Sequence, residues 1–377
     1  MDWRVLVVDD LQAADVAEII QGNKVVDHPD SIICVQCPNF SQAMERLKEE
    51  RFDLIILDLK DDAAEEQGPL AGETVFSELK KYRFLPVIFH TGFPDKVSDL
   101  ASACVKVVTR GDNPLTLRAA VKEVLDTKLP KLIRSIEEEQ RKFMWESADQ
   151  IWSEDLGKGN ASDLVYLLAR RLANTLSGEA VRRFLESDGI DGAPKSDKIH
   201  AVELYVYPPL SDHFFFGDIF KKKDGESAEY FIVLTPSCDL VHSKADFVLL
   251  GKCNHLVDTP PGLSAKESLA AGKGMSKTLV DKLSSYIKDR YPPEDRFKYL
   301  PGTSFLPDLV VDLQDIRAVA PTVLNPGGGG YERIASLDSP FAESLQSKMM
   351  KYLGRIGTPD IDVDLALSRF IERINAA

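Results

Sequence analysis

The sequence has 377 residues, a formal net charge of −14 and a pI of about 5.0, with 44% hydrophobic and 28% charged residues. This composition excludes a disordered or fibrous chain, the length accommodates two or three domains, and the acidic balance does not favour nucleic acid as the main partner. We find neither a signal peptide nor a run of about 18 apolar residues, so we expect a cytoplasmic protein with no membrane partner.

Residues 1–126 alternate between short apolar runs and amphipathic segments. Runs with strand character cover residues 4–8, 31–37, 53–57, 85–90 and 105–109. Segments with helical spacing cover residues 11–21, 41–50, 72–81 and 95–103, and a last helix starts at Asn113 and Pro114. Five successive strand–helix units predict an α/β fold, a parallel sheet with helices on both faces that binds ligands beyond the carboxyl ends of its strands.

Three acidic residues stand at such strand ends. Asp9 and Asp10 follow the first strand, and Asp58 follows the third. Converging carboxylates with no basic neighbour in sequence repel one another, and their oxygen atoms are suitable ligands for Mg²⁺. A carboxylate is also a nucleophile toward phosphorus, and a bound metal neutralises charge on the group that is transferred. The pattern therefore predicts a Mg²⁺ site with a carboxylate available for phosphoryl transfer.

The segments VLVVDD, DLIILDL and VIFHTG resemble, in this order, the three signatures of receiver domains of bacterial response regulators. The resemblance covers residues 1–126 and implies a flavodoxin-like, doubly wound, five-stranded parallel sheet. It implies that Asp58 is the phosphoacceptor and that Thr91 hydrogen-bonds a phosphoryl oxygen. The phosphoryl donor would be a sensor histidine kinase or a phosphotransfer protein. The metal ligands that the resemblance implies are Asp10, Asp58 and the carbonyl of Lys60, assisted by Asp9.

Two positions depart from the family pattern. The lysine that the family carries at the end of the fifth strand is replaced by Arg110, which is followed by Gly111. Arginine keeps the charge but presents a planar fork in place of a point charge. The aromatic switch residue is replaced by Val107. The expected catalytic set is therefore Asp58, Thr91 and Arg110, and the alternative is a receiver-like domain that does not accept phosphate.

Residues 127–194 have the composition of a helical linker. Leu132, Ile136 and Phe143 fall on one face of a charged helix, and a second helix starts at Ser162. The apolar pattern is too short to indicate a coiled coil. We favour helix packing within one chain, and pairing with a second copy as a homodimer is the alternative.

Residues 195–377 predict a mostly β output or interaction domain with a C-terminal helix. The strand-like runs are AVELYVYP, FFFGDIF, EYFIVLTP, DFVLLGKC and LVVDLQDIRAV, and turn residues separate them. Ser339 and Pro340 stand at the start of the helical tail. The run FFFGDIF followed by EYFIVLTPSCDL resembles the opening of small SH3-like barrels such as the MazF/PemK toxin class.

The chain has five cysteines, an odd and sparse set that does not indicate a disulfide framework. Cys34 and Cys37 form a C-x-x-C pair, but residues three apart in a strand point to opposite faces. We favour two buried strand cysteines there, with a metal or redox site as the alternative.

A second candidate site lies in the C-terminal region. Two thiols and two imidazoles could complete a tetrahedral Zn²⁺ shell, although their spacing is not that of a standard zinc finger. Alternatively, Cys238 with Asp239 and His242 forms a nucleophilic cluster. We favour a third interpretation, a buried strand end at which Cys238 is a small apolar residue. The four candidate zinc ligands are Cys238, His242, Cys253 and His255.

The sequence thus predicts a two-component phosphorelay response regulator that catalyses its own phosphorylation on Asp58 and controls a C-terminal output domain. The expected domains are residues 1–126, 127–194 and 195–377. One alternative is a phosphate sink or protein-interaction platform without catalytic output. Another is an RNA-directed or thiol-dependent enzyme in the C-terminal region.

Overall fold

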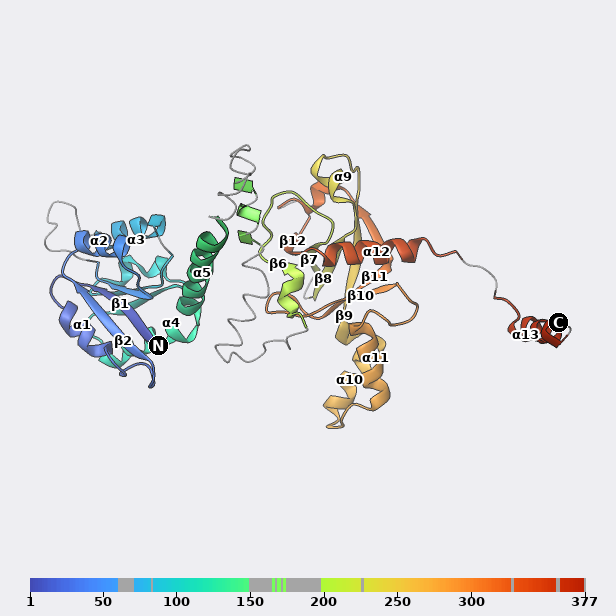
Figure 1. Ribbon diagram of the computed structural model, residues 1–377, viewed down its shortest axis with the longest axis horizontal. Helices are drawn as coiled ribbons and strands as arrows, with labels where there is room; N and C mark the ends of the chain where they lie inside the picture. The colour runs from blue at the N-terminus through green and yellow to red at the C-terminus, as the bar shows by residue number, and fades with distance from the viewer. Residues whose placement is uncertain are drawn as a thin grey trace. The chain divides into compact units, whose positions relative to one another are not determined.

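The computed structural model divides into two compact units, Met1–Asp191 and Gly192–Ala377 (Figure 1). The residues that the structure describes are 1–59, 71–82, 84–148, 165–166, 168–170, 172–173, 198–224, 227–326, 329–356 and 360–375.

The first unit contains a five-stranded sheet in which every neighbouring pair is parallel. The strand order β2-β1-β3-β4-β5 reverses direction at β1, so the sheet is doubly wound, as the sequence predicts. All four residues of the run LIIL are buried, because a parallel strand is covered on both faces. The strands are β1 (Asp2–Val8), β2 (Ser31–Cys37), β3 (Leu54–Leu57), β4 (Val87–Thr91) and β5 (Val105–Thr109).

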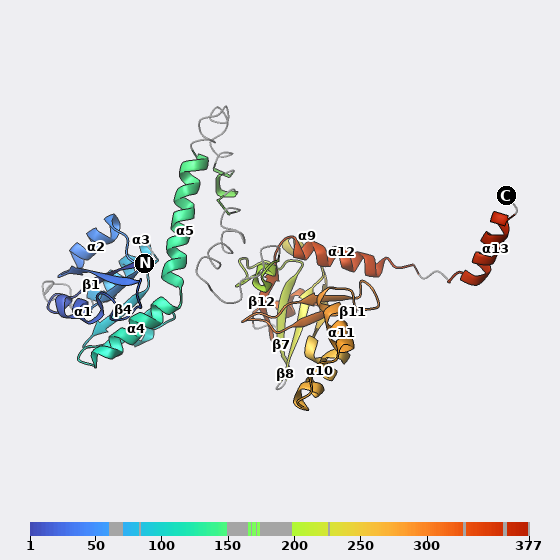
Figure 2. The same cartoon turned by 60° about the horizontal axis from the view of Figure 1, so that its bottom comes forward.

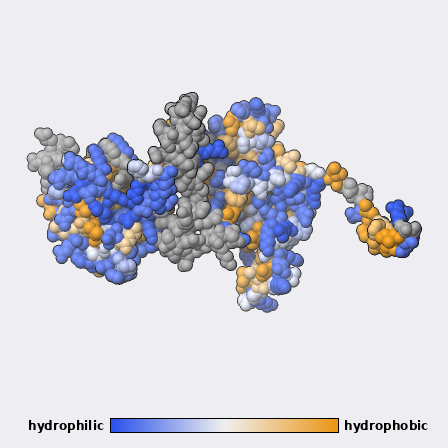
Figure 3. Space-filling view, in the orientation of Figure 1, coloured by the Kyte–Doolittle hydropathy of each residue, from blue (hydrophilic) through white to orange (hydrophobic). Residues whose placement is uncertain are grey.

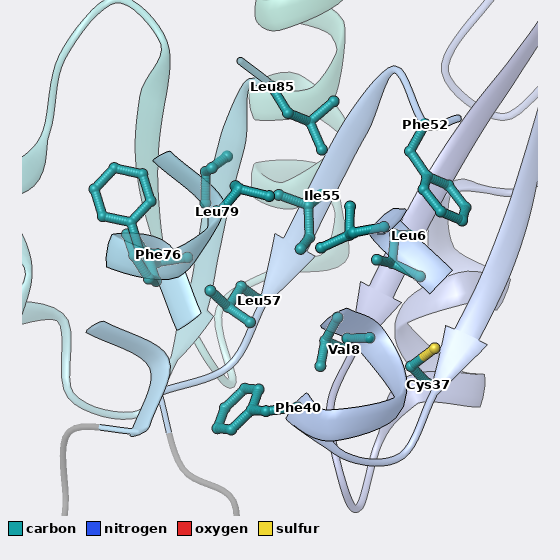
Figure 4. Close-up of a cluster of buried hydrophobic side chains, with 14 of the residues drawn as sticks. Leu6, Val8, Cys37, Phe40, Phe52, Ile55, Leu57, Phe76, Leu79 and Leu85 are labelled. Carbon is teal, nitrogen blue, oxygen red and sulfur yellow. The ribbon is translucent and has the colours of Figure 1, made fainter. Parts of the chain in front are cut away.

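Helices cover both faces of this sheet. Helices α2 and α3 pack on a core that includes Leu6, Ile55 and Leu79, part of which Figure 4 draws. Helices α1 and α4 pack on the opposite core. Cys37 lies in the first core and Cys34 lies beside the second, and both are free thiols. The helices are α1 (Ala13–Ile20), α2 (Phe40–Glu49), α3 (Ala71–Tyr82) and α4 (Pro114–Asp126).

The helix expected over residues 95–103 does not form. Two short 3₁₀ turns, Pro94–Lys96 and Ser98–Leu100, take its place. The Ser98 hydroxyl donates to the Asp95 carbonyl, and the Ser102 hydroxyl accepts from the Cys104 amide. Short polar side chains that bond to nearby backbone compete with the helical pattern, which explains the difference.

The linker begins with α5 (Leu129–Phe143), followed by a π-helical turn at Met144–Ala148. Residues 165–166, 168–170 and 172–173 are also helical. The predicted start of a second linker helix at Ser162 lies outside the described residues.

The second unit contains a seven-stranded antiparallel sheet with the order β10-β11-β9-β8-β7-β12-β6, so the expectation of a mostly β domain is confirmed. Neighbouring residues alternate between two cores: Ile232 belongs to one, and Phe231 and Val233 to the other. The strands are β6 (Tyr205–Val206), β7 (Asp218–Asp224), β8 (Ser227–Val233), β9 (Val248–His255), β10 (Phe297–Leu300), β11 (Leu309–Val319) and β12 (Tyr331–Leu337).

Figure 2 draws α10, α11 and α12 beside this sheet. The predicted helical tail is present and begins at Phe341, and Figure 3 shows apolar side chains exposed on its last helix, α13. Among the described residues, no helix is long and apolar enough to cross a membrane. The helices are α9 (Ser237–Val241), α10 (Pro260–Ala270), α11 (Lys277–Ile287), α12 (Phe341–Leu353) and α13 (Val363–Asn375).

One local prediction in this unit was wrong, and two helices were not predicted. Most of the run AVELYVYP is not a strand, because Ala201–Leu204 forms a 3₁₀ turn. A capping box between His200 and Glu203 stabilises that turn. Helices α10 and α11 have no counterpart among the predicted elements, although Thr259 caps α10 and prolines follow at its first positions.

Candidate functional site

Three carboxylates meet at the carboxyl edge of the parallel sheet. Strands β1 and β3 are neighbours, and Val8 is paired with Leu57. This register places Asp9 and Asp58, the next residues along, side by side. One carboxylate oxygen from each of Asp9, Asp10 and Asp58 lies within 4.8 Å of the others, and no other such His, Cys, Asp or Glu group occurs among the described residues.

One oxygen of each buried carboxylate is held by backbone amides. Asp9 is 4% exposed, and its Oδ1 accepts hydrogen bonds from the amides of Leu11, at 3.0 Å, and Gln12, at 2.7 Å. Asp58 is 3% exposed, and its Oδ1 accepts from the Leu59 amide at 2.8 Å. The orientation of both side chains is therefore fixed.

Arg110 contacts the second oxygen of both carboxylates. Its Nη2 lies 2.6 Å from Asp9 Oδ2 and 2.7 Å from Asp58 Oδ2. The Arg110 side chain is 24% exposed, and its backbone amide donates to the Thr91 carbonyl at 2.7 Å. The residue expected to replace the family lysine is thus brought to the acids from the end of β5, which pairs with β4 up to Thr91 and Thr109.

Thr91 is the last residue of β4, at the same edge of the sheet as the acids. It is fully buried, its hydroxyl accepts from the Phe93 amide at 3.1 Å, and its influence lowers the pKa of the Asp58 carboxyl. The hydroxyl is therefore fixed beside the carboxylate that the sequence analysis singled out.

Burial raises the pKa of Asp58 above its usual range. Arg110, the Leu59 amide and Thr91 oppose this shift, while the neighbouring charge of Asp9 adds to it. The Asp58 carboxyl group is thus largely desolvated, and its two oxygens contact the Arg110 guanidinium and the Leu59 amide.

The donor set fits a hard divalent cation. All three clustered side chains offer carboxylate oxygens, the ligands that Mg²⁺ prefers. Asp10 is only half-buried, so the cluster is open to solvent on one side. The predicted carbonyl ligand of Lys60 lies outside the described residues.

His90 was overlooked by the sequence analysis. It is 8% exposed and precedes Thr91 in the strand, and its Nδ1 has no hydrogen-bond partner among the described residues. Burial lowers its pKa, and the charge of Arg110 lowers it further. The signal in the sequence was its position in VIFHTG, one residue before the expected site threonine.

The four candidate zinc ligands are not brought together. Cys238 and His242 belong to α9 and its end, whereas Cys253 and His255 belong to β9. Cys253 is buried in the sheet core, where burial raises its pKa far above the usual thiol range. The structure therefore does not support the predicted Zn²⁺ site.

The favoured alternative for this segment also needs correction. Cys238 is exposed and lies on a short helix, so it is not a buried residue at a strand end. Its thiol is 3.7 Å from Asp239 Oδ1. The helix starts directly after Pro236, which explains why the run EYFIVLTP ends its strand earlier, at Val233.

Comparison with known proteins gives one consistent result. No family model and no curated protein matches the chain. Among solved structures, the response regulator TrrA from Thermotoga maritima, in complex with Mg²⁺ and BeF, matches with 25% identity and a TM-score of 0.25, covering 32% of this chain and 98% of that one. A CheY-like receiver domain from Methanospirillum hungatei matches with 21% identity and a TM-score of 0.27, covering 34% of this chain and 97% of that one.

A further match is the crystal structure of the histidine kinase ThkA in complex with TrrA, with 25% identity and a TM-score of 0.25, covering 33% of this chain and 98% of that one. The matches concern the N-terminal third of the chain, which contains the five-stranded parallel sheet. This third of the chain is similar to solved receiver domains of response regulators.

Proposed function

We propose that the protein is a two-component response regulator and that Asp58 accepts a phosphoryl group. The observation that carries this proposal is the convergence of Asp9, Asp10 and Asp58 with Thr91 and Arg110 at the carboxyl edge of the sheet. Ligands of doubly wound folds bind at this edge.

The reaction is an in-line displacement at phosphorus. An Asp58 oxygen forms a bond to the phosphorus of a phosphohistidine, and the bond from phosphorus to the imidazole nitrogen breaks. The imidazole leaves with the electron pair and takes a proton from solvent. Hydrolysis of the aspartyl phosphate later regenerates the carboxylate.

Each side chain of the cluster has a role in this step. The Leu59 amide holds Asp58 Oδ1, so the nucleophile is oriented before the donor arrives. Thr91 and Arg110 place a hydroxyl and a guanidinium where the charge of the transferred group develops. Asp9, Asp10 and Asp58 are the residues that would hold Mg²⁺, which neutralises phosphoryl charge when it is bound.

The division of labour along the chain is part of the proposal. Residues 1–126 would receive the phosphoryl group, and residues 195–377 would act as the output or interaction domain. Residues 127–194 would connect these two parts of the chain. The division of the chain into two compact units supports a domain boundary between residues 1–126 and residues 195–377. The donor would be a sensor histidine kinase or a phosphotransfer protein.

The test is phosphorylation of the full chain by acetyl phosphate with Mg²⁺, followed by intact mass. The expected result is a gain of one phosphoryl group in the wild type and in Asp112→Asn, and none in Asp58→Asn. Asp112 is a matched control because it is an exposed acid in the turn after Arg110 and outside the cluster. An unchanged wild-type mass would overturn the proposal.

A further inference from the structure

The last helix of the chain, α13, carries large apolar side chains that are open to solvent. All of its residues, Val363–Asn375, are exposed. Leu367, Phe370 and Ile374 are 54%, 59% and 57% exposed, whereas Leu345 on α12 is fully buried. Single exposed apolar residues are common on protein surfaces, but here they gather on one helix, as Figure 3 shows. Such a gathering marks an interaction surface.

The apolar residues of α13 form one stripe along the helix. Positions three and four apart share a helix face, and apolar residues in this segment recur at spacings of four, three and four. This is the spacing of the seam between two paired helices. The stripe consists of Val363, Leu367, Phe370 and Ile374, with Ile371 beside it. Leu365 lies on the opposite face of the helix.

A helix of this length needs a partner. Isolated helices shorter than about 12–15 residues are only marginally stable in water, and α13 has 13 residues. Most of the stability of a protein helix comes from the packing of its apolar face. The stripe is therefore the part of α13 that a partner would cover.

The charges of residues 360–375 indicate which partner fits. The first half of this segment contains three acids and no base, whereas the second half contains two bases and one acid. An antiparallel second copy brings the acidic half of one helix beside the basic half of the other, while a parallel copy would gather six acids at one end. The charged residues are Asp360, Asp362 and Asp364, followed by Arg369, Glu372 and Arg373.

The stripe also matches itself in the antiparallel direction. When the midpoints of two copies are aligned, Val363 is level with Ile374 of the second copy, and Leu367 is level with Phe370 of the second copy. Every layer of the pair then receives one apolar side chain from each helix. The same alignment brings the acidic first turn of each copy, with Asp364, level with the last turn of the other.

We propose that α13 is a self-association helix, which pairs in antiparallel orientation with α13 of a second copy of this chain. The pair joins two C-terminal units in a symmetric dimer. One pair of short helices is a small interface beside the about 1,200–2,000 Å² of stable complexes, so the dimer is weak and forms at high protein concentration. The pairing involves no residue of the acid cluster and does not rest on the proposed function.

The first test is sedimentation velocity of the full chain from about 5 to about 500 µM, where a weak dimer becomes populated. Leu367→Asp places a charge in the stripe, and we expect it to raise the dissociation constant at least about tenfold. Leu365→Asp is the matched control, because it makes the same change on the opposite face and should dimerise like the wild type. Both positions are exposed in the single chain, so both variants should keep the wild-type Tm.

The second test determines the orientation of the pair by disulfide formation. Val363→Cys and Ile374→Cys are made in a Cys238→Ser background, because Cys238 is an exposed thiol. In an antiparallel pair, one position lies about 16 Å along the axis from the same position of the second copy, too far for a disulfide. We expect oxidised glutathione to link the two variants when they are mixed, and peptide mass spectrometry to identify the linkage between positions 363 and 374.

Four outcomes would overturn the proposal. A wild-type chain that stays monomeric at the highest concentration would do so, and so would an equal loss of dimer in Leu367→Asp and Leu365→Asp. Disulfides that join each variant to itself, and not to the other, would exclude the antiparallel pair. A monomeric chain that floats with vesicles of phosphatidylcholine and phosphatidylglycerol would assign the stripe to a lipid surface instead.

Discussion

Arg134 on α5 and Asp53, directly before β3, form an ion pair of 2.5 Å, and the Asp53 side chain is 1% exposed. Asp53 Oδ2 also accepts from the Arg4 amide, and Arg134 lies over the ring of Trp3. Strand β3 has Asp53 directly before it and Asp58 directly after it. The linker helix is therefore attached to the strand that carries the candidate phosphoacceptor, at the end opposite to the acid cluster.

This ion pair is expected to stabilise the first unit. Arg134→Met keeps the apolar stem but leaves Asp53 buried without its cation, so we expect the free energy of unfolding to fall by about 2–4 kcal/mol. Urea unfolding monitored by circular dichroism measures the loss. Arg141→Met, at an exposed position of the same helix, is the control and should unfold like the wild type. A wild-type midpoint for Arg134→Met would show that the pair contributes nothing.

The raised pKa of Asp58 predicts a stability that depends on pH. A carboxyl group whose pKa is higher in the folded than in the unfolded protein stabilises the fold at acidic pH, and this contribution is lost as the pH rises through the folded-state pKa. Asp58→Asn should therefore be more stable than the wild type at pH 7, and the difference should shrink toward pH 4. Urea midpoints at the two pH values test this, with Asp112→Asn as the control. A difference that grows on acidification would contradict the burial argument.

Thr91 is expected to act through its hydroxyl. Thr91→Val removes the buried hydroxyl at the acid cluster at nearly constant volume, so the rate of phosphorylation by acetyl phosphate should fall by about tenfold to a hundredfold. Thr91→Ser keeps the hydroxyl and should lose far less. The rates are measured by intact mass over time. Equal rates for the valine and serine variants would assign Thr91 a packing role only.

The two C-terminal cysteines should differ in reactivity. Cys238 is exposed, while Cys253 is 2% exposed and has a pKa raised by burial. We expect iodoacetamide at pH 8 to modify Cys238 in the native protein and Cys253 only in urea. Peptide mass spectrometry identifies the modified residue, and Cys238→Ser confirms the assignment. Protection of Cys238 that a zinc chelator removes would restore the metal-site hypothesis.

Local sequence patterns were sufficient for the parallel sheet. A fully apolar run such as LIIL predicts a strand that is covered on both faces. Once the strands are taken as parallel, the connection rules place their carboxyl ends, and with them the acids, at one edge of the sheet. Arg110 could be placed at the end of β5, but its contact with both Asp9 and Asp58 could not be predicted. That contact depends on the distance between two strand ends and on the length of one side chain.

The remaining features depend on residues that are distant in sequence. Asp53 and Arg134 are 81 positions apart, and neither carries a local signal for the other. In the antiparallel sheet, β12 pairs with β7 and β6, more than a hundred residues earlier. Strand patterns identify such segments but not their partners, because a period of two is common to every half-buried strand.

The most direct test of the central claim is chemical trapping of the phosphorylated residue. The chain is treated with acetyl phosphate and Mg²⁺, reduced with sodium borohydride, which converts an acyl phosphate to an alcohol, and digested for peptide mass spectrometry. We predict homoserine at position 58 and unmodified aspartate at positions 9 and 10. Homoserine at another position, or none in a protein that binds Mg²⁺, would contradict the assignment of Asp58 as the phosphoacceptor.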